Sequence, residues 1–213
     1  MKIELKEREK EFYYSILNKF YSKVNNTRPI TDKSINFYDF FDENFQIYYG
    51  CTKIALVPKN KGARYILKIP MGEHDYCEAE VQVYESARRG QVERFFTPIE
   101  VFDSENYDFP VYIQLKAKVN RYSEEDDFYE AQEDWSFLSE ESRDAVFSID
   151  MSEKVVDEML RVYAPEEVEE LITFCAEEQI NDIHAGNYGW YKGAPIIFDF
   201  SGIGRNVEKM RGI

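Results

Sequence analysis

Apolar positions along the first half of the chain form short continuous runs separated by polar turns. Runs rich in aromatic and β-branched residues cover Phe45–Pro58 and Arg64–Pro70, with a polar, glycine-containing turn between them. Such a pair of runs predicts a β-hairpin. Two further runs, Phe95–Phe102 and Phe109–Leu115, flank the acidic turn Asp103–Asp108. The pattern therefore predicts a small antiparallel sheet of about five strands.

A second pattern, in which apolar residues recur every three or four positions, predicts helices. It covers Glu7–Val24, Cys77–Arg89, Ser152–Tyr163 and Pro165–Glu178. The last of these begins with a proline and has glutamates in its first turn, which are both typical of a helix start. The predicted fold class is α+β, with a small antiparallel sheet and one helix followed by a mostly helical part.

Length and composition limit the class of protein. With 213 residues the chain suits one large or two small domains. No apolar run approaches the roughly 20 residues that span a bilayer, and the charged N-terminus lacks a signal-peptide core, so we expect no membrane association. The three cysteines, Cys51, Cys77 and Cys175, lack metal-ligand spacing. An odd number of distant cysteines fits reduced thiols and predicts a cytoplasmic protein.

The chain is strongly acidic, with 26 basic and 41 acidic residues and a net charge of 26 − 41 = −15. This balance argues against nucleic-acid binding, which requires a basic surface. Ten acidic residues and one basic residue occupy the stretch 124–144. Such a run is typical of a solvated insertion. Its apolar residues Trp135, Phe137 and Leu138 leave open a second interpretation, a surface for a basic protein partner.

Hard oxygen ligands gather near the end of the sequence. A strand at Tyr188–Tyr191, a polar turn and a strand at Ile196–Phe198 predict a hairpin, which brings Asn187 and Asp199 to the same end. Amide and carboxylate oxygens suit Mg²⁺, which takes few protein ligands. Asp182, five residues before Asn187, can then face a substrate hydroxyl.

A structural interpretation of the same stretch also stands. Asp182 and Asn187 are residue types that favour turns, because their side chains bond to nearby backbone. On that interpretation His184 is a packed histidine.

Lys68 is the candidate cation of the first half. It lies between Leu67 and Ile69 in a run that should be mostly buried. A buried lysine needs a partner, or it loses its charge. The helix predicted at Cys77–Arg89 offers Glu80 as the first candidate and Glu78 as the second. The alternative is that the lysine reaches solvent from an edge strand.

The turn Asp-x-His-x-Gly-Asn at 182–187, followed by apolar-Asp-Phe-Ser-Gly at 198–202, resembles the catalytic loop and metal-binding motif of the protein-kinase-like fold. Its His-x-Gly-Asn form is more similar to the aminoglycoside and choline kinase branch. Two positions depart from the pattern. Ile180 stands where the usual histidine precedes the catalytic aspartate, and Ser201 lies between the phenylalanine and the glycine of the metal motif.

The resemblance implies a role for each residue of the second half. Asp182 would orient the acceptor hydroxyl, while Asn187 and Asp199 would bind Mg²⁺. The cofactors implied are ATP and Mg²⁺.

The resemblance also implies roles in the first half. Lys68 would bind the nucleotide phosphates and pair with Glu80. Gly50 is the one glycine in the position of the phosphate loop, where kinases use several. The adenine ring would meet backbone near Gln114–Ala117.

A bilobal organisation follows from the resemblance. It comprises an N-terminal helical extension at 1–44, a nucleotide-binding lobe at 45–116 and a reduced second lobe at 117–213 that contains the acidic insertion 124–144. The matching part runs from Phe45 to Gly202, and the region that normally binds the phosphate acceptor has no counterpart. We therefore expect either a minimal phosphotransferase with an unspecified acceptor or a pseudokinase that acts through protein contacts.

Overall fold

The computed structural model describes residues 2–24, 42–72, 74–107, 109–119 and 129–201. The chain divides into two compact units, the first made of Met1–Val81 and Pro98–Lys116 and the second of Gln82–Thr97 and Ala117–Ile213. The described residues are α+β, as predicted. None of the helices in these ranges is both long enough and apolar enough to cross a membrane.

The first unit contains a five-stranded antiparallel sheet in the order β1-β2-β3-β5-β4, which confirms the predicted sheet. Its strands are β1 Phe45–Tyr49, β2 Lys53–Pro58, β3 Tyr65–Pro70, β4 Ile99–Asp103 and β5 Val111–Leu115. The apolar run 45–58 is itself a hairpin, because the chain turns at Gly50–Thr52. Side chains alternate between the two faces of the sheet, so Tyr65 and Leu67 share one face while Lys68 lies on the other.

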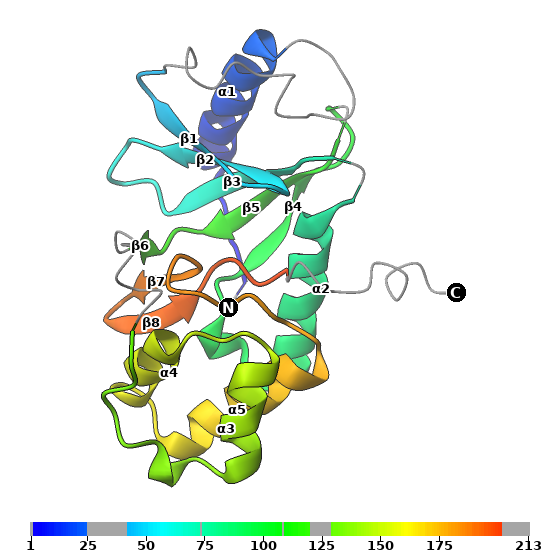
Figure 1. Cartoon of the computed structure of the whole chain (residues 1–213). Coiled ribbons are helices and arrows are strands. Elements are labelled where there is room, and N and C mark those ends of the chain that lie inside the picture. Colours follow the sequence, from blue (N-terminus) through cyan, green and yellow to red (C-terminus); the bar gives the residue numbers. More distant parts are fainter. Residues whose placement is uncertain (1, 25–41, 73, 108, 120–128, 202–213) are drawn as a thin grey trace. The chain divides into compact units, whose positions relative to one another are not determined.

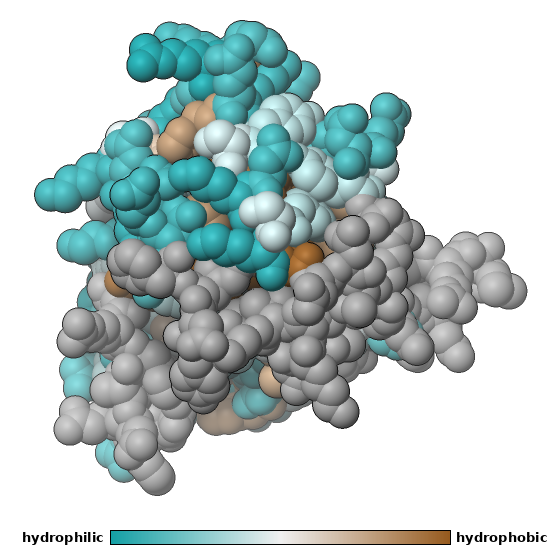
Figure 2. All heavy atoms as spheres, turned by 90° about the horizontal axis from the view of Figure 1, so that it is seen from above, coloured by the Kyte–Doolittle hydropathy of each residue, from teal (hydrophilic) through white to brown (hydrophobic). Residues whose placement is uncertain are grey.

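Helix α1, Glu7–Lys23, packs on the face that carries Tyr65 (Figure 1). The Tyr13 hydroxyl donates a hydrogen bond of 3.1 Å to the Tyr65 carbonyl, and its ring meets Phe102 of β4 edge-on. Four side chains of α1 are buried, Tyr13, Ile16, Leu17 and Phe20. In the view from above Figure 1, most of the surface drawn in colour is hydrophilic (Figure 2). The helix is therefore an integral part of the first unit.

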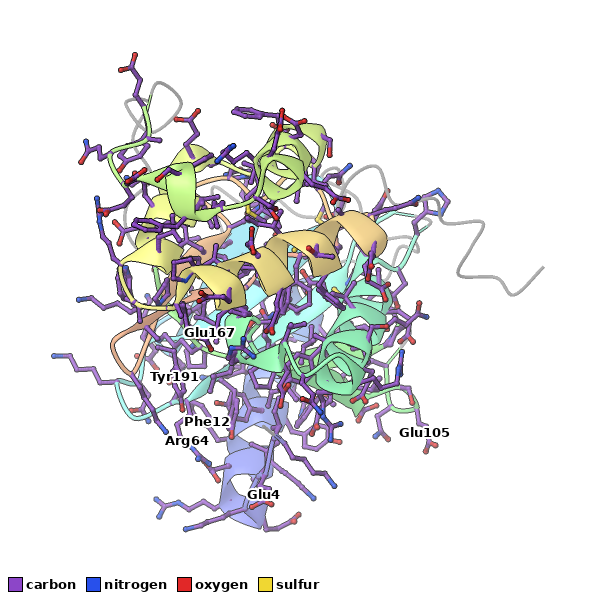
Figure 3. All side chains as sticks on the ribbon, turned by 90° about the horizontal axis from the view of Figure 1, so that it is seen from below. Glu4, Phe12, Arg64, Glu105, Glu167 and Tyr191 are labelled. Carbon is purple, nitrogen blue, oxygen red and sulfur yellow. The ribbon has the colours of Figure 1, made fainter. Side chains whose placement is uncertain are left out.

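Arg64, just before β3, forms hydrogen bonds with residues at the start of α1 (Figure 3). Its guanidinium donates to the Glu4 carbonyl at 3.3 Å and to the Glu9 carboxylate at 3.1 Å. Glu9 also accepts from the backbone N–H of Lys6 at 3.0 Å, which satisfies one of the donors left open at the helix start.

The strand predicted at Phe95–Phe102 begins later than expected. Residues Glu93–Phe95 form a short 3₁₀ helix, η2, and β4 starts at Ile99. The backbone N–H of Thr97 donates instead to the Ile197 carbonyl at 2.9 Å, and Phe96 forms a parallel bridge with Ile197. The first half of the apolar run thus pairs within the second unit, because β8 offers it a partner that the sequence pattern does not show.

The second unit combines a three-stranded sheet, in the order β6-β7-β8, with helices (Figure 1). Its elements are β6 Lys118–Val119, β7 Tyr188–Tyr191, β8 Ala194–Ile197, η4 Trp135–Phe137, α3 Glu140–Ser148, α4 Glu153–Leu160 and α5 Pro165–Glu177. Helix α2, Tyr76–Arg89, contributes its first residues to the first unit and the rest to this one. Strands β6 and β7 approach so closely that a Cβ at Gly189 would lie 2.8 Å from the Lys118 carbonyl oxygen, which requires glycine there.

The described part of the predicted acidic insertion 124–144 is largely exposed, and it is also folded against the second unit. Residues 124–128 lie outside the described residues, and Glu140–Ser148 forms α3, which the charge pattern did not predict. The fully buried carboxylate of Asp157 accepts hydrogen bonds from four groups, namely the Tyr129 hydroxyl, the backbone N–H groups of Gln132 and Glu133, and the Trp135 indole. The Asp157 carboxylate, on α4, therefore holds the segment 129–135 in place within the second unit.

Candidate functional site

Lys68 and Glu80 form the ion pair that the sequence predicted. The ammonium of Lys68, on β3, lies 2.7 Å from Oε2 and 3.0 Å from Oε1 of Glu80, on α2. Lys68 is 3% exposed and Glu80 is fully buried. The alternative in which Lys68 reaches solvent is therefore wrong.

A second lysine, which sequence reasoning missed, joins this pair. The ammonium of Lys53, at the start of β2, lies 2.8 Å from Oε1 of Glu80 and the residue is 6% exposed. Residue Ala55 pairs with Lys68 across the two strands, so Lys53, two positions away, shares the face of Lys68. In the sequence Lys53 gives the same signal as Lys68, a lysine beside apolar strand residues. The face on which Lys53 lies, however, depends on where β2 begins after the turn at Gly50–Thr52, and the sequence pattern did not show that turn.

Helix α2 is fixed against the sheet by Tyr112 of β5. The Tyr112 hydroxyl lies 2.6 Å from a carboxylate oxygen of Asp75 and 3.2 Å from one of Glu78. Burial raises the pKa of Tyr112 well above its usual value, and the bond to Asp75 raises it further, so the hydroxyl stays protonated and donates. Asp75 in turn accepts from the backbone N–H of Glu78 at 2.9 Å, which caps the start of α2.

Glu78, the second candidate partner of Lys68, is in contact with Tyr112, while Glu80, the first candidate, forms an ion pair with Lys68. Because Tyr112 pairs directly with Lys68 across β3 and β5, it lies next to the ion pair on the same face. The two contacts together set the position of the helix that carries Glu80.

Gly50 lies in the turn between β1 and β2. Its backbone N–H donates to the Lys53 carbonyl at 3.1 Å, so this donor already serves the turn. No atom lies within 4 Å of the position that a Cβ would take at Gly50, and its φ is not in the left-handed range. The protein's own packing therefore does not require glycine at this position.

The predicted adenine-contacting backbone at Gln114–Ala117 begins in β5 and ends at the unit boundary. The N–H of Leu115 donates to the Pro98 carbonyl at 2.9 Å, and that of Lys116 donates to the Arg64 carbonyl at 2.8 Å. The chain passes from the first unit to the second between Lys116 and Ala117.

In the second unit, α5 leads into the loop that carries Asp182, His184 and Asn187. Ile180 and Ile183 are fully buried, and Ile183 exchanges backbone bonds with Asp150 and Ser152, at 3.2 and 2.9 Å. Asp182 itself has a φ of +62°, a left-handed conformation that aspartate tolerates better than most residues. The loop is thus anchored by its isoleucines, while Asp182 stays half-buried.

Asn187 closes this loop. Its side-chain Nδ2 donates to the Asp182 carbonyl at 2.8 Å, and its backbone N–H donates to the His184 carbonyl at 2.9 Å. Because the NH₂ group faces the loop backbone, the amide oxygen Oδ1 is the atom on the opposite side of the group. The turn-forming interpretation of Asn187 is thus correct for its NH₂ group, and Oδ1 is the atom of this side chain that the predicted metal site would use.

Asp199 is joined to Asn187 through backbone. The Asn187 carbonyl accepts from the N–H of Phe198 at 2.9 Å and from that of Asp199 at 3.3 Å. Strands β7 and β8 pair antiparallel with Tyr188 opposite Ile197, so the residues that flank the hairpin lie at one end. The predicted hairpin is confirmed, with its second strand at Ala194–Ile197 in place of Ile196–Phe198. Gly202, the last residue of the motif, lies outside the described residues.

His184 is a loop-forming residue. It is exposed, so the interpretation of a packed histidine is wrong. Its Nδ1 accepts from the backbone N–H of Gly186 at 3.0 Å. A Cβ at Gly186 would lie 2.7 Å from the ring carbon Cε1, so the contact requires glycine two residues after the histidine. The His-x-Gly part of the motif therefore shapes the turn.

The oxygen donors of Asn187 and Asp199 fit Mg²⁺ in type, because this ion prefers carboxylate and amide oxygens and usually completes its shell with phosphate and water. The described residues contain no group of three or more His, Cys, Asp and Glu side chains able to hold a metal ion. A metal at this hairpin would therefore depend on oxygens from its ligand and solvent.

Comparison of the chain with protein-family models, with curated proteins and with solved structures finds no match.

Proposed function

We propose that the protein is a minimal kinase-like phosphotransferase that uses ATP and Mg²⁺. The observation that carries the proposal is the buried Lys68–Glu80 pair, which joins a central strand of a five-stranded antiparallel sheet to α2 at 2.7 Å. A buried charged pair is costly to form. A role in binding phosphate accounts for the placement of a lysine on an otherwise apolar strand.

The second unit supports the same proposal through its oxygen ligands. Asn187 and Asp199 would hold Mg²⁺, which would bridge phosphate oxygens and neutralise their developing charge. Asp182 would orient the acceptor hydroxyl without binding the metal. Phosphoryl transfer depends chiefly on such positioning and charge stabilisation, so few residues are sufficient.

Thermal unfolding with and without ATP and Mg²⁺ tests the proposal. A ligand that binds only the folded protein at 100 times its Kd adds about 2.7 kcal/mol of stability, which corresponds to an increase in Tm of roughly 5–10 °C for a chain of this size. We expect this increase for the parent protein with Mg·ATP and its loss in Asp199→Ala. Asp144→Ala, which removes an exposed carboxylate on α3, is the matched control.

A parent protein whose Tm does not respond to Mg·ATP contradicts the proposal. If Mg·ATP raises the Tm of the parent and of Asp199→Ala equally, the protein binds nucleotide but Asp199 is not a metal ligand.

A pseudokinase or binding protein is the second candidate, favoured by one surface feature. Phe137 of η4 and Phe147 of α3 are 68% and 66% exposed on a strongly acidic segment. Of the three apolar residues noted in the sequence, only Phe137 is available to a basic partner, since Leu138 is buried and the Trp135 indole binds Asp157. A parent protein that transfers no phosphate and does not hydrolyse ATP would favour this function.

A further inference from the structure

Helix α3 has one face packed within the second unit and one exposed face. It packs on α5, and its residues Ser142 and Val146 are buried (Figure 1). Glu140, Asp144 and Phe147 follow one another at spacings of four and three, which places them together on the opposite face, and all three are exposed. Phe147 is 66% exposed. The outer face of α3 therefore combines carboxylates with an aromatic ring.

Phe137 adjoins this face. It is 68% exposed and lies in η4, three residues before α3 begins. The Arg143 guanidinium joins α3 to η4, because it donates to the Trp135 carbonyl at 3.1 Å and to the Leu138 carbonyl at 2.8 Å. Among the large apolar residues that the structure describes, Phe137 and Phe147 have the highest exposed fractions. Single exposed apolar residues are common, but two of them on joined elements indicate a contact surface.

The charge on the outer face of α3 has one sign. Arg143 is the one basic residue between positions 129 and 150, and its guanidinium binds the backbone carbonyls. Glu140 and Asp144 are four residues apart, and such a like-charge pair destabilises a helix. The last turn of α3 has no basic residue to interact with the helix dipole. Cations supplied by a partner would remove this repulsion.

Contacts on the inner side already hold this surface in one conformation. The Asp157 carboxylate binds the Trp135 indole and the backbone N–H groups of residues 132 and 133. The Ser139 side chain caps α3, and its backbone N–H donates to the Glu169 carboxylate of α5. A surface that is ordered before it binds loses little conformational entropy on association.

We propose that these two elements form a docking surface for a basic protein segment that has apolar residues among its lysines and arginines. The α3 surface consists of Phe137, Glu140, Glu141, Asp144 and Phe147. Its negative charge repels nucleic acid and anionic lipid and attracts a cationic segment. The two phenylalanine rings would contact the apolar residues of the partner, while the carboxylates would pair with its cations. The inference gives the second candidate function a surface and a class of partner, and it holds whether or not the protein transfers phosphate.

Fluorescence anisotropy of short labelled peptides tests the proposal on the full chain. The first peptide contains lysine and leucine, the second lysine and serine, and the third glutamate and leucine. Because the α3 surface would use both charge and apolar contact, only the first peptide matches it. The parent should bind this peptide at least about tenfold more tightly than either of the others, which corresponds to 1.4 kcal/mol.

The aromatic contribution is measured with Phe137→Ala/Phe147→Ala. This double variant should weaken binding of the lysine–leucine peptide by at least about tenfold. Tyr48→Ala removes an aromatic side chain that is 53% exposed on β1, and this matched control should change the affinity by less than about twofold. All three side chains are exposed, so the variants should keep the Tm of the parent. Equal binding by the parent and the double variant overturns the proposal.

The charge contribution is measured by neutralising the three carboxylates of the α3 surface, with Glu140→Gln, Glu141→Gln and Asp144→Asn. Peptide binding should weaken at low salt and should depend less on salt concentration, because exposed charges are screened. A control variant removes the same charge elsewhere, from the exposed glutamates Glu11, Glu105 and Glu166. If the two triple variants weaken binding equally, the peptide is attracted only by the overall charge of the chain, which contradicts the proposal.

Other occupants of the α3 surface give different results. Self-association of the parent that Phe137→Ala/Phe147→Ala abolishes, measured by sedimentation, would assign the surface to a second copy of this chain. Binding to phosphatidylcholine vesicles but to neither lysine peptide would assign it to a lipid surface. Either result overturns the proposal, as does a parent protein that binds none of the peptides. The response of the Tm to Mg·ATP tests the phosphotransferase separately and is expected to be the same in the parent and the double variant.

Discussion

The two groups of candidate residues are held in place in opposite ways. In the first unit, Lys53, Lys68 and Glu80 are buried and are fixed by ion pairs between their own side chains. In the second unit, Asp182 and Asp199 are half-buried, and the contacts described above hold them through backbone bonds and the Asn187 amide. In the first group the stability of the fold and the proposed function therefore depend on the same atoms, whereas in the second group they depend on different atoms.

The largest expected effect on stability comes from Glu80→Gln. Removing the carboxylate leaves two buried ammonium groups without the charge that they share, and breaking a buried pair in this way costs about 3–5 kcal/mol. Urea denaturation monitored by circular dichroism measures the change in the free energy of unfolding. Glu85→Gln, which loses an exposed pair with Arg88 on the same helix, should cost less than about 1 kcal/mol. If Glu80→Gln and Glu85→Gln lose equal free energies of unfolding, the buried ion pairs of the first group do not contribute more to stability than an exposed pair does.

Tyr112→Phe should cause the next largest loss of stability. It removes a hydroxyl that donates to Asp75 at 2.6 Å, and hydrogen bonds to charged groups contribute about 1.5–3 kcal/mol. Because this contact fixes α2, which carries Glu80, nucleotide affinity should fall together with stability. The same urea experiment and an ATP titration measure the two effects. Tyr48→Phe, on an exposed residue of β1, serves as the control. Unchanged stability in Tyr112→Phe would show that α2 is held elsewhere.

Asn187 permits the two roles of one side chain in the second unit to be separated. Asn187→Asp and Asn187→Ala both lose the bond from Nδ2 to the Asp182 carbonyl, so each should lose about 0.5–1.5 kcal/mol of stability. Asn187→Asp retains an oxygen for Mg²⁺ and should keep Mg²⁺-dependent ATP binding, which Asn187→Ala should lose. Isothermal titration with ATP at several Mg²⁺ concentrations distinguishes them. Equal ATP binding by both variants would exclude Asn187 as a metal ligand.

The smallest effect on stability is expected for Asp182→Asn. Asparagine also tolerates the φ of +62° at this position, so the free energy of unfolding should change by less than about 0.5 kcal/mol. Loss of the carboxylate should nevertheless slow phosphate transfer by about 100-fold or more, with Mg·ATP binding retained. Asp150→Asn, which changes an exposed aspartate with a φ of +52°, should alter neither quantity. An active parent and an equally active Asp182→Asn would remove Asp182 from the chemistry.

The sequence predicted those parts of the fold whose signals are local. Helices α1, α2, α4 and α5, the five-stranded sheet and the hairpin at β7–β8 follow from short-range periodicity, and the Lys68–Glu80 contact follows from the demand of a buried charge for a partner. Lys53 was missed because its burial depends on how β2 pairs with β3. The folded state of the acidic segment was missed for a similar reason, since Asp157 binds it from a helix about 25 residues further along the chain.

The bonds to Asp157 have a consequence for the timescale on which the acidic segment opens. The backbone amides of Gln132 and Glu133 lie outside any helix or strand, and such amides ordinarily exchange with solvent quickly. Here their hydrogens point at a buried carboxylate, so exchange requires the segment to detach from α4. In deuterium exchange, these two amides should therefore behave like those of a core helix, although the segment that carries them is one of the most charged in the chain.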